Sequence, residues 1–263
     1  MSRGPGGKQG GKRGGKRGGT RAGRRGATAG EFAGRSLKSR VRTAKGRSAA
    51  STRWLQRQLS DRYVEEARRR GYRARSAFKL IQLDDKLRLI RRGARVVDLG
   101  AAPGSWSQVA VERAGAAGRV VGIDLEPVEP LAGASFLVGD VRDPEAAGRL
   151  RAALSGPADL VMSDMAAAAT GHAPTDHLRT MALAEAALDI AEALLAPGGA
   201  FVAKVLQGGS EAALLDRLKH GFLKVRHVKP PASRKDSAEL YVVATGFLGA
   251  GAEGEDRPAE GAP

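Results

Sequence analysis

The sequence predicts an α/β fold in which helices cover both faces of a mostly parallel sheet. Three observations support this prediction. Short β-branched runs alternate with helix-like stretches between residues 53 and 248, a glycine-rich turn follows the first run, and Asp residues end the next two runs. Such alternation is typical of strand–helix–strand units with parallel strands. We therefore expect a single folded domain over 53–248.

Two helices are expected before the first strand. The first covers about 60–70, with Ser60 as its cap and Gly71 as its stop signal. The second covers about 75–87 and has an apolar stripe of Leu80, Leu83 and Leu87.

Six strands are expected after these helices. They cover 95–99, 119–124, 135–138, 159–163, 200–206 and 240–245. Four helices are expected between them, at 105–115, 144–154, 176–195 and 210–220. The stretch Ala196-Pro-Gly-Gly199 is expected to end the longest helix before the next strand begins.

The charge of the chain is strongly asymmetric. The 263 residues include 44 Lys+Arg and 28 Asp+Glu, a net charge of +16. Residues 1–50 hold 15 Lys or Arg and one acidic residue, residues 51–95 hold 14 and 5, and the remainder holds 15 and 22. This distribution indicates that the N-terminal part meets an anionic polymer.

Two terminal segments have compositions unlike the domain between them. Residues 1–52 are rich in Gly, Arg and Lys, and 249–263 are rich in Gly, Ala and Glu. Neither can bury enough apolar surface to offset its ordering entropy, so both are expected to be disordered tails. We interpret the basic tail as a non-specific phosphate-binding arm, and the alternative is a solubilising extension.

Composition also excludes several classes of protein. The chain has no Cys, which excludes disulfides, thiolate zinc sites and a cysteine nucleophile. No apolar run approaches the roughly 20 residues of a membrane span, and the N-terminus lacks the apolar region of a secretory signal. We expect a cytoplasmic protein without membrane contact.

The first strand leads into a turn suited to close ligand approach. Its sequence is Asp98-Leu-Gly-Ala-Ala-Pro-Gly-Ser-Trp106, in which Gly100 and Gly104 leave room for a ligand beside the backbone. Ligands of open α/β sheets bind at the carboxyl ends of the strands. The turn lacks the G-x-G-x-x-G pattern of dinucleotide-binding proteins, which argues against a nicotinamide dehydrogenase.

Two Asp residues extend this predicted binding site. Asp124 ends the second strand and can accept hydrogen bonds from both hydroxyls of a ribose, and Asp140 follows the third strand, where an adenine ring would lie. The three features together predict a nucleoside cofactor without a pyrophosphate, namely S-adenosylmethionine. The alternative is a tight turn beside two capping or solvated Asp residues.

Lys204 stands inside the otherwise apolar run 201–206. A buried lysine costs several kcal/mol unless it is paired or functional, so we expect a function for it. The alternative is an edge-strand lysine that points to solvent. Asp164 ends a strand and would otherwise be a cap, whereas Glu239 and Lys79 are unremarkable when taken alone.

Six motifs in order carry a resemblance to a known family. They are Ser76-Ala-Phe-Lys-Leu80, Val97-Asp-Leu-Gly-Ala-Ala-Pro-Gly-Ser-Trp-Ser-Gln108, Met162-Ser-Asp-Met165, Ala196-Pro-Gly-Gly199, Phe201-Val-Ala-Lys-Val205 and Glu239-Leu-Tyr-Val-Val-Ala-Thr-Gly246. With them, residues 53–247 closely resemble the FtsJ/RrmJ (RlmE) family of ribosomal RNA 2′-O-ribose methyltransferases. The sequence departs from the family pattern at Ser105, where a second glycine is usual, and at 165–171, where an Asn is common.

The resemblance implies a Rossmann-like S-adenosylmethionine-dependent methyltransferase fold with seven strands, the last pair antiparallel. It implies a uridine of 23S ribosomal RNA, within the large ribosomal subunit, as the substrate. It implies a catalytic tetrad of Lys79, Asp164, Lys204 and Glu239. It also implies S-adenosylmethionine contacts at Gly104, Trp106, Asp124, Asp140 and Asp164.

The chemistry agrees with these roles. A ribose hydroxyl is a poor nucleophile at neutral pH, and a lysine amine can serve as its base. No metal is required. His172 and His177 have no matched third ligand, so we do not expect a metal site there. Asp98 and Arg95 are expected to have structural roles. We expect a monomer. The alternatives are methylation of another RNA, such as tRNA, or an RNA-binding protein that has lost catalysis.

Overall fold

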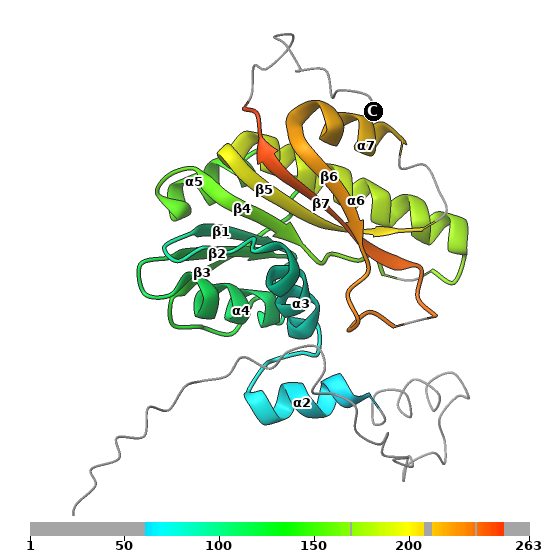
Figure 1. Cartoon of the computed structure of the whole chain (residues 1–263), viewed down its shortest axis with the longest axis horizontal. Coiled ribbons are helices and arrows are strands. Elements are labelled where there is room, and N and C mark those ends of the chain that lie inside the picture. Colours follow the sequence, from blue (N-terminus) through cyan, green and yellow to red (C-terminus); the bar gives the residue numbers. More distant parts are fainter. Residues whose placement is uncertain (1–60, 169, 208–211, 235, 250–263) are drawn as a thin grey trace, which may run out of the picture. The chain divides into compact units, whose positions relative to one another are not determined.

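The computed structural model describes residues 61–168, 170–207, 212–234 and 236–249. These residues form a seven-stranded sheet with the strand order β3-β2-β1-β4-β5-β7-β6 (Figure 1). The strands are β1 (Arg95–Leu99), β2 (Arg119–Asp124), β3 (Ala134–Val138), β4 (Ala158–Ser163), β5 (Leu195–Leu206), β6 (Phe222–Val228) and β7 (Glu239–Phe247). Strands β1 to β5 pair in parallel, and β7 lies antiparallel between β5 and β6.

Helices pack on both faces of this sheet, as the sequence predicted. They are α2 (Arg62–Arg70), α3 (Ala77–Leu87), α4 (Ser105–Ala114), α5 (Ala146–Leu154), α6 (Ala173–Leu194) and α7 (Ala212–Gly221). One core cluster joins α5, α6 and α7 to the sheet, and the other joins α3 and α4 to its opposite face. Neighbouring strand residues alternate between the clusters, Val96 in one and Val97 in the other, because successive side chains point to opposite faces.

The N-terminal helices differ slightly from the prediction. Asp61 caps α2 by accepting a hydrogen bond of 3.0 Å from the backbone N–H of Tyr63, and the predicted cap Ser60 lies outside the described residues. Gly71 ends α2 with a φ of 76°, as expected of a left-handed stop position. The second helix, α3, begins at Ala77, two residues later than predicted.

Two predictions about the C-terminal half were wrong. Strand β6 was missing from the six strands read from residue patterns, because its side chains are mostly exposed and show no apolar alternation. The stretch 196–199 does not separate a helix from a strand. Instead α6 ends at Leu194 and β5 begins at the next residue, with an irregular register against β4 between Ala158 and Leu160.

The predicted tail 1–52 lies outside the described residues, as do residues 250–263 of the second predicted tail. Within the part of the chain that is described, no helix has the length and apolar character needed to span a bilayer.

The buried carboxyl of Asp98 ties the first strand to the helix that follows the glycine-rich turn. It lies in β1, only 1% exposed, and accepts a hydrogen bond of 2.6 Å from the Ser107 hydroxyl on α4. Burial raises the pKa of Asp98 to about 7, and repulsion from Asp164 and Asp124 adds to the rise, while the bond from Ser107 opposes it. Asp98 is therefore structural in its contacts, as expected.

This raised pKa makes a prediction about stability. The folded chain retains the Asp98 proton up to about pH 7, whereas the unfolded chain loses it near 3.8. The contribution of Asp98 to stability is therefore complete below pH 3.8 and declines as the pH rises toward 7. Asp98→Asn, which stays neutral, should raise the free energy of unfolding relative to wild type by roughly 1–3 kcal/mol more at pH 8 than at pH 5.

Urea denaturation of both proteins at the two pH values measures this difference. Glu126→Gln serves as the control, because the Glu126 side chain is exposed and its loss should leave the pH dependence unchanged. An equal effect of Asp98→Asn at both pH values would contradict the assignment.

Candidate active site

A cavity of about 360 Å³ opens at the carboxyl ends of the parallel strands. It lies beside the junction of β1 and β4, where the strand order reverses, which is the usual ligand position in such sheets. Its lining residues are Gly100, Ala102, Ile123, Asp124, Leu125, Gly139, Asp140, Val141, Arg142, Asp164, Met165, Ala166 and Leu183. Its volume is in the range of small-molecule binding sites.

Asp124 fixes the backbone of the glycine-rich turn beside this cavity. One carboxylate oxygen of Asp124 accepts a hydrogen bond of 2.9 Å from the Ala102 N–H, and the other accepts one of 3.0 Å from the Glu126 N–H. Gly100 has a φ of 74°, and a Cβ there would lie 2.3 Å from the Met165 Cγ. Glycine is therefore required at this position both for the turn and for the close packing of the next loop.

Asp140 forms the far side of the cavity together with Arg142. The Arg142 guanidinium contacts both carboxylate oxygens of Asp140, with a shortest distance of 2.6 Å. These hydrogen bonds and the positive charge lower the pKa of Asp140, so the carboxylate is ionised at neutral pH.

The structure brings three of the five predicted cofactor residues to the cavity, and the other two do not line it. Gly104 precedes α4 with a φ of 99°. The Trp106 side chain is buried, its indole N–H donates a 2.9 Å hydrogen bond to the Ser76 carbonyl, and its ring packs against Tyr241. Trp106 is thus a core residue that joins α4 to α3. Its predicted contact with the cofactor stays a prediction.

Arg73, which sequence reasoning did not single out, hydrogen-bonds the backbone of the glycine-rich turn. Its guanidinium donates hydrogen bonds to the carbonyls of Pro103, Glu129 and Pro130, at 3.1, 2.8 and 2.8 Å. The turn after β1 and the loop after β2 are thereby fixed to one another. Nothing in the local sequence distinguishes Arg73 from the other arginines around it.

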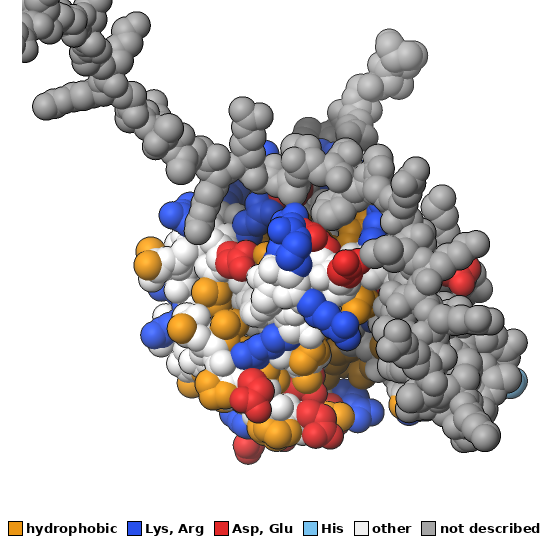
Figure 2. All heavy atoms as spheres, turned by 90° about the horizontal axis from the view of Figure 1, so that it is seen from below, with side chains coloured by type: hydrophobic (Ala, Val, Ile, Leu, Met, Phe, Trp, Pro, Cys, Tyr) orange, Lys and Arg blue, Asp and Glu red, His pale blue; other side chains and the backbone are white. Residues whose placement is uncertain are grey.

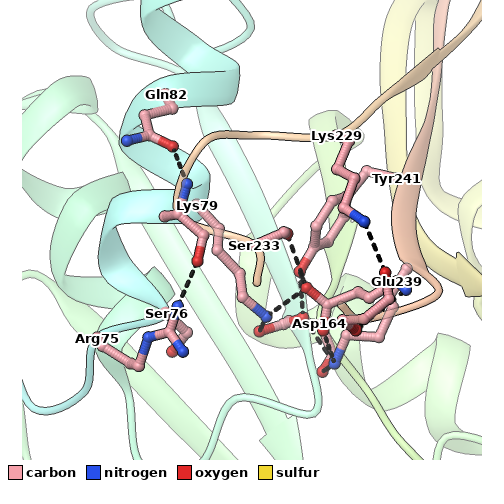
Figure 3. Close-up of polar contacts among 12 residues, drawn as sticks. Arg75, Ser76, Lys79, Gln82, Asp164, Lys229, Ser233, Glu239 and Tyr241 are labelled. Atoms are coloured by element: carbon pink, nitrogen blue, oxygen red, sulfur yellow. Dashed lines mark hydrogen bonds and ion pairs between the residues drawn. The ribbon is translucent and has the colours of Figure 1, made fainter. Parts of the chain in front are cut away.

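The four residues of the predicted tetrad converge around Asp164, which lines the cavity. Figure 3 labels three of them, Lys79, Asp164 and Glu239. Lys79 Nζ lies 2.8 Å from Glu239 Oε1 and 3.6 Å from Asp164 Oδ2. Lys204 Nζ lies 2.8 Å from Asp164 Oδ1 and 3.7 Å from Glu239 Oε2, and it also donates a 2.9 Å hydrogen bond to the Asp164 carbonyl. Two cations therefore alternate with two anions.

Each member of the tetrad comes from a different element. Lys79 lies on α3, Asp164 follows β4, Lys204 lies on β5 and Glu239 begins β7. Because β5 lies between β4 and β7, the alternative of an edge-strand lysine pointing to solvent is excluded. Both lysines are only 9% exposed, so the two carboxylates supply the pairing that their burial requires.

The electrostatics of the tetrad keep Glu239 ionised. Burial on its own raises the pKa of this carboxyl, but the attraction of Lys79 and Lys204 outweighs burial and lowers the pKa below its ordinary value. A hydrogen bond of 2.9 Å from the Ser233 hydroxyl to Glu239 Oε1 acts in the same direction.

Tyr241 is a further member of the cluster that sequence reasoning missed. Its hydroxyl donates a 2.6 Å hydrogen bond to Asp164 Oδ1. Burial, Asp164 and Glu239 raise the pKa of Tyr241 well above its ordinary value, which keeps it a donor. A signal was available, because Tyr241 stands two residues after Glu239 and a strand places such residues on one face.

The remaining sequence candidates lie away from this cluster. The Arg95 backbone N–H donates a 2.8 Å hydrogen bond to Asp159, and His172 Nδ1 lies 2.8 Å from the Thr175 hydroxyl. In the described ranges, His, Asp and Glu side chains do not gather in threes as metal ligands.

Comparison with known proteins now identifies the family. The family model described as FtsJ-like methyltransferase matches residues 72–247. The chain belongs to the FtsJ-like methyltransferase family. Its expected fold, a Rossmann-like sheet of seven strands, and its expected class of enzyme, a methyltransferase, are thereby confirmed.

Curated relatives of this FtsJ-like methyltransferase share most of its length. It is 61% identical over 207 residues to a protein of Gluconobacter oxydans named ribosomal RNA large subunit methyltransferase E, covering 79% of this chain and 76% of the relative. A Xanthobacter autotrophicus protein of the same name is 59% identical over 219 residues, covering 82% and 86%. A crystal structure of a Plasmodium falciparum protein described as a ribosomal RNA methyltransferase matches with a TM-score of 0.61 and 29% identity, covering 68% of this chain and 100% of that one.

The geometry of the methyltransferase site makes a prediction about Tyr241. Tyr241→Phe removes the hydroxyl that bonds Asp164 but keeps the ring against Trp106. We expect the rate of methyl transfer to fall about three- to tenfold with little change in thermal stability, because one hydrogen bond to a charged group is lost. Tyr72→Phe is the control, since that hydroxyl bonds Glu112 on the surface. Equal rates for the two variants would contradict a role for Tyr241 in the site.

Proposed function

We propose that the chain transfers the methyl group of S-adenosylmethionine to a ribose 2′-hydroxyl, that of a uridine in 23S ribosomal RNA of the large ribosomal subunit. The observation that carries the proposal is the shared position of Asp164, which lines the cavity and also bonds Lys204. A ligand in the cavity and a ribose hydroxyl beside Lys204 would therefore both lie next to the Asp164 carboxylate.

The residues around the cavity fit this cofactor. Each carboxylate oxygen of Asp124 accepts a single backbone hydrogen bond, which leaves lone pairs for two ribose hydroxyls. Ile123, Leu125 and Val141 supply apolar surface for an adenine ring beside Asp140. S-adenosylmethionine bound there would supply a methyl group on a positively charged sulfur.

Lys204 has the geometry of a group that accepts a proton from a hydroxyl. Two acceptors within hydrogen-bond distance, Asp164 Oδ1 and the Asp164 carbonyl, occupy two of the three tetrahedral positions on Nζ. Glu239 Oε2, at 3.7 Å, is beyond hydrogen-bond distance of Nζ. In the neutral amine the third position is a lone pair, which can take the proton of a ribose hydroxyl. Asp164 thus holds the amine in a fixed orientation.

The other members of the tetrad hold this arrangement in place. Lys79 pairs with Glu239 and approaches the second oxygen of Asp164, so neither carboxylate is left as an unpaired buried charge. Tyr241 adds a donor to Asp164 from β7. Alignment of the hydroxyl with the methyl group then supplies much of the remaining rate acceleration.

RNA as the substrate is supported by charge and by the relatives. The relatives are named as methyltransferases of large-subunit ribosomal RNA, and residues 1–95 of this chain, with 29 Lys or Arg and 6 acidic residues, carry all of its excess positive charge. In the described residues, Lys and Arg side chains are interspersed over the face shown in Figure 2. We propose that the enzyme acts as a cytoplasmic monomer and that the basic segment 1–52 adds non-specific RNA affinity.

Lys204 provides the direct test of catalysis. Lys204→Ala should reduce single-turnover methyl transfer roughly 10²–10⁴-fold while cofactor affinity stays nearly unchanged and the protein still folds, with a lower Tm because Asp164 loses a paired charge. Lys204→Arg should not restore activity, because a guanidinium does not release a proton in this pH range. The measurement uses ribosomal particles from cells that lack the gene, with saturating S-adenosylmethionine.

The control is Lys86→Ala, an exposed lysine on the same chain. A near wild-type rate for Lys204→Ala would move the catalytic role to Lys79. No transfer by the wild-type protein to any RNA would instead favour the RNA-binding alternative. Mapping of 2′-O-methylated nucleotides in cells with and without the gene distinguishes a uridine of 23S ribosomal RNA from a tRNA position.

Asp124 provides a separate test of the cofactor site. Asp124→Ala removes the acceptor for the ribose hydroxyls, so the Kd for S-adenosylmethionine should rise about 10- to 100-fold, with RNA affinity little changed. Isothermal titration measures this, with Asp189→Ala as the control, because Asp189 on α6 pairs with Arg217 on α7 and does not line the cavity. An unchanged Kd for Asp124→Ala would overturn the assignment.

A further inference from the structure

We propose that Gln82 and Ser233 are positioning residues, through which α3 fixes the loop between β6 and β7 and thereby orients Glu239 in the tetrad. The inference rests on the proposed function, since it concerns the same reaction. It adds two side chains that touch neither the cavity nor Lys204.

The loop segment 232–233 is held by side chains of a distant part of the chain. The Ala232 N–H donates a 2.7 Å hydrogen bond to Gln82 Oε1, and the Ala232 carbonyl accepts one from the Arg75 guanidinium. Both backbone polar groups of Ala232 are therefore bound across a separation of 150 residues or more. Ala232 is 1% exposed, so these side chains replace the water that such a loop would otherwise require.

The anchoring side chains are themselves held. Arg75 pairs with Asp61 at 2.8 Å, and Arg234 of the same loop approaches that carboxylate at 3.6 Å. The Gln82 amide donates a 3.2 Å hydrogen bond to the Tyr63 hydroxyl. The loop thus rests on a fixed surface built from α2 and α3.

Ser233 carries this anchoring to the tetrad. It is buried, and its hydroxyl donates a 2.9 Å hydrogen bond to Glu239 Oε1 (Figure 3). Lys79 Nζ lies 2.8 Å from the same oxygen, and the Tyr241 hydroxyl lies 3.4 Å from it. In the described part of the chain, the other oxygen, Oε2, has only the 3.7 Å approach of Lys204.

This asymmetry explains what the loop contributes. The two donors that bond Oε1, Ser233 and Lys79, fix the plane of the carboxylate, and Oε2 is then directed toward Lys204. Without the Ser233 bond, the carboxylate can rotate about its bond to the methylene group. Lys79 also comes from α3, three residues before Gln82, so one helix face sets both the loop and the cation that meet at Glu239.

The charged groups around Glu239 predict a pH signature. Lys79 faces it from α3, Lys204 from β5, Asp164 from the end of β4 and Tyr241 from its own strand. Loss of the Ser233 bond leaves these groups in place and removes one interaction that lowers the pKa of Glu239. The pKa of Glu239 should therefore be higher in Ser233→Ala than in wild type, which NMR titration of the Glu239 carboxyl measures.

The experiment compares Gln82→Met with Gln82→Glu. Met has a similar length but no acceptor for the Ala232 N–H, whereas Glu retains an oxygen at that position. We expect Gln82→Met to lower kcat about five- to twentyfold with the KM for ribosomal particles and the Kd for S-adenosylmethionine within twofold of wild type. Gln82→Glu should recover most of the rate. Ser233→Ala should lower kcat similarly and raise the pKa of Glu239.

The outcomes separate this inference from the proposed function. Methyl transfer by the wild-type protein tests the function, and only the ratios between variants test the positioning role. Equal rates for Gln82→Met and wild type, or an unchanged pKa of Glu239 in Ser233→Ala, would overturn it. If Gln82→Met fails to fold, the pair Ser233→Ala and Ser233→Thr decides. Thr retains the hydroxyl and should recover the rate, and equal loss in both would contradict the inference.

Discussion

The carboxylate of Asp164 is the point on which the rest of the site depends. It follows β4, next to the reversal of strand order, and there it lines the cavity while bonding Lys204 and Tyr241 and approaching Lys79. A carboxylate that is largely removed from solvent, as this one is, needs donors and cations around it. The strand order therefore determines the site, because it places β5 and β7 close enough to Asp164 to supply those partners.

The same constraint makes the four charges interdependent. Removal of any one of them leaves a neighbouring charge buried without its partner, and the cost of such a change exceeds the value of the pair itself. Because residues 232–233 are anchored on α3, the neutral Ser233 hydroxyl also bonds Glu239, and this carboxylate does not depend on Lys79 alone. The paired charges and the hydrogen bonds of the loop at 232–233 thus stabilise the same arrangement of the tetrad.

The sequence predicted the elements that have strong periodicity or chemistry. The parallel strands, the glycine turn and the burial of Lys204 followed from apolar runs and from the energetic cost of a buried amine. Strand β6 did not, because an edge strand with mostly exposed side chains has no apolar alternation. Ser233 could not be singled out either, since hydroxyl residues are common in loops, whereas Tyr241 was missed although its spacing from Glu239 places both on one face of a strand. Lys79 and Glu239 were identified by family resemblance alone.

The antiparallel placement of β7 has a function in this arrangement. In a parallel sheet only the carboxyl ends of strands reach the cavity, but β7 runs in the opposite direction and brings its amino end there. Lys204 lies opposite Tyr241 in the register, and Leu206 lies opposite Glu239. Because side chains two residues apart share a face, Tyr241 and Glu239 project on the same side as Lys204. A parallel strand in this position would present its first residues at the far edge of the sheet, where Glu239 could meet neither lysine.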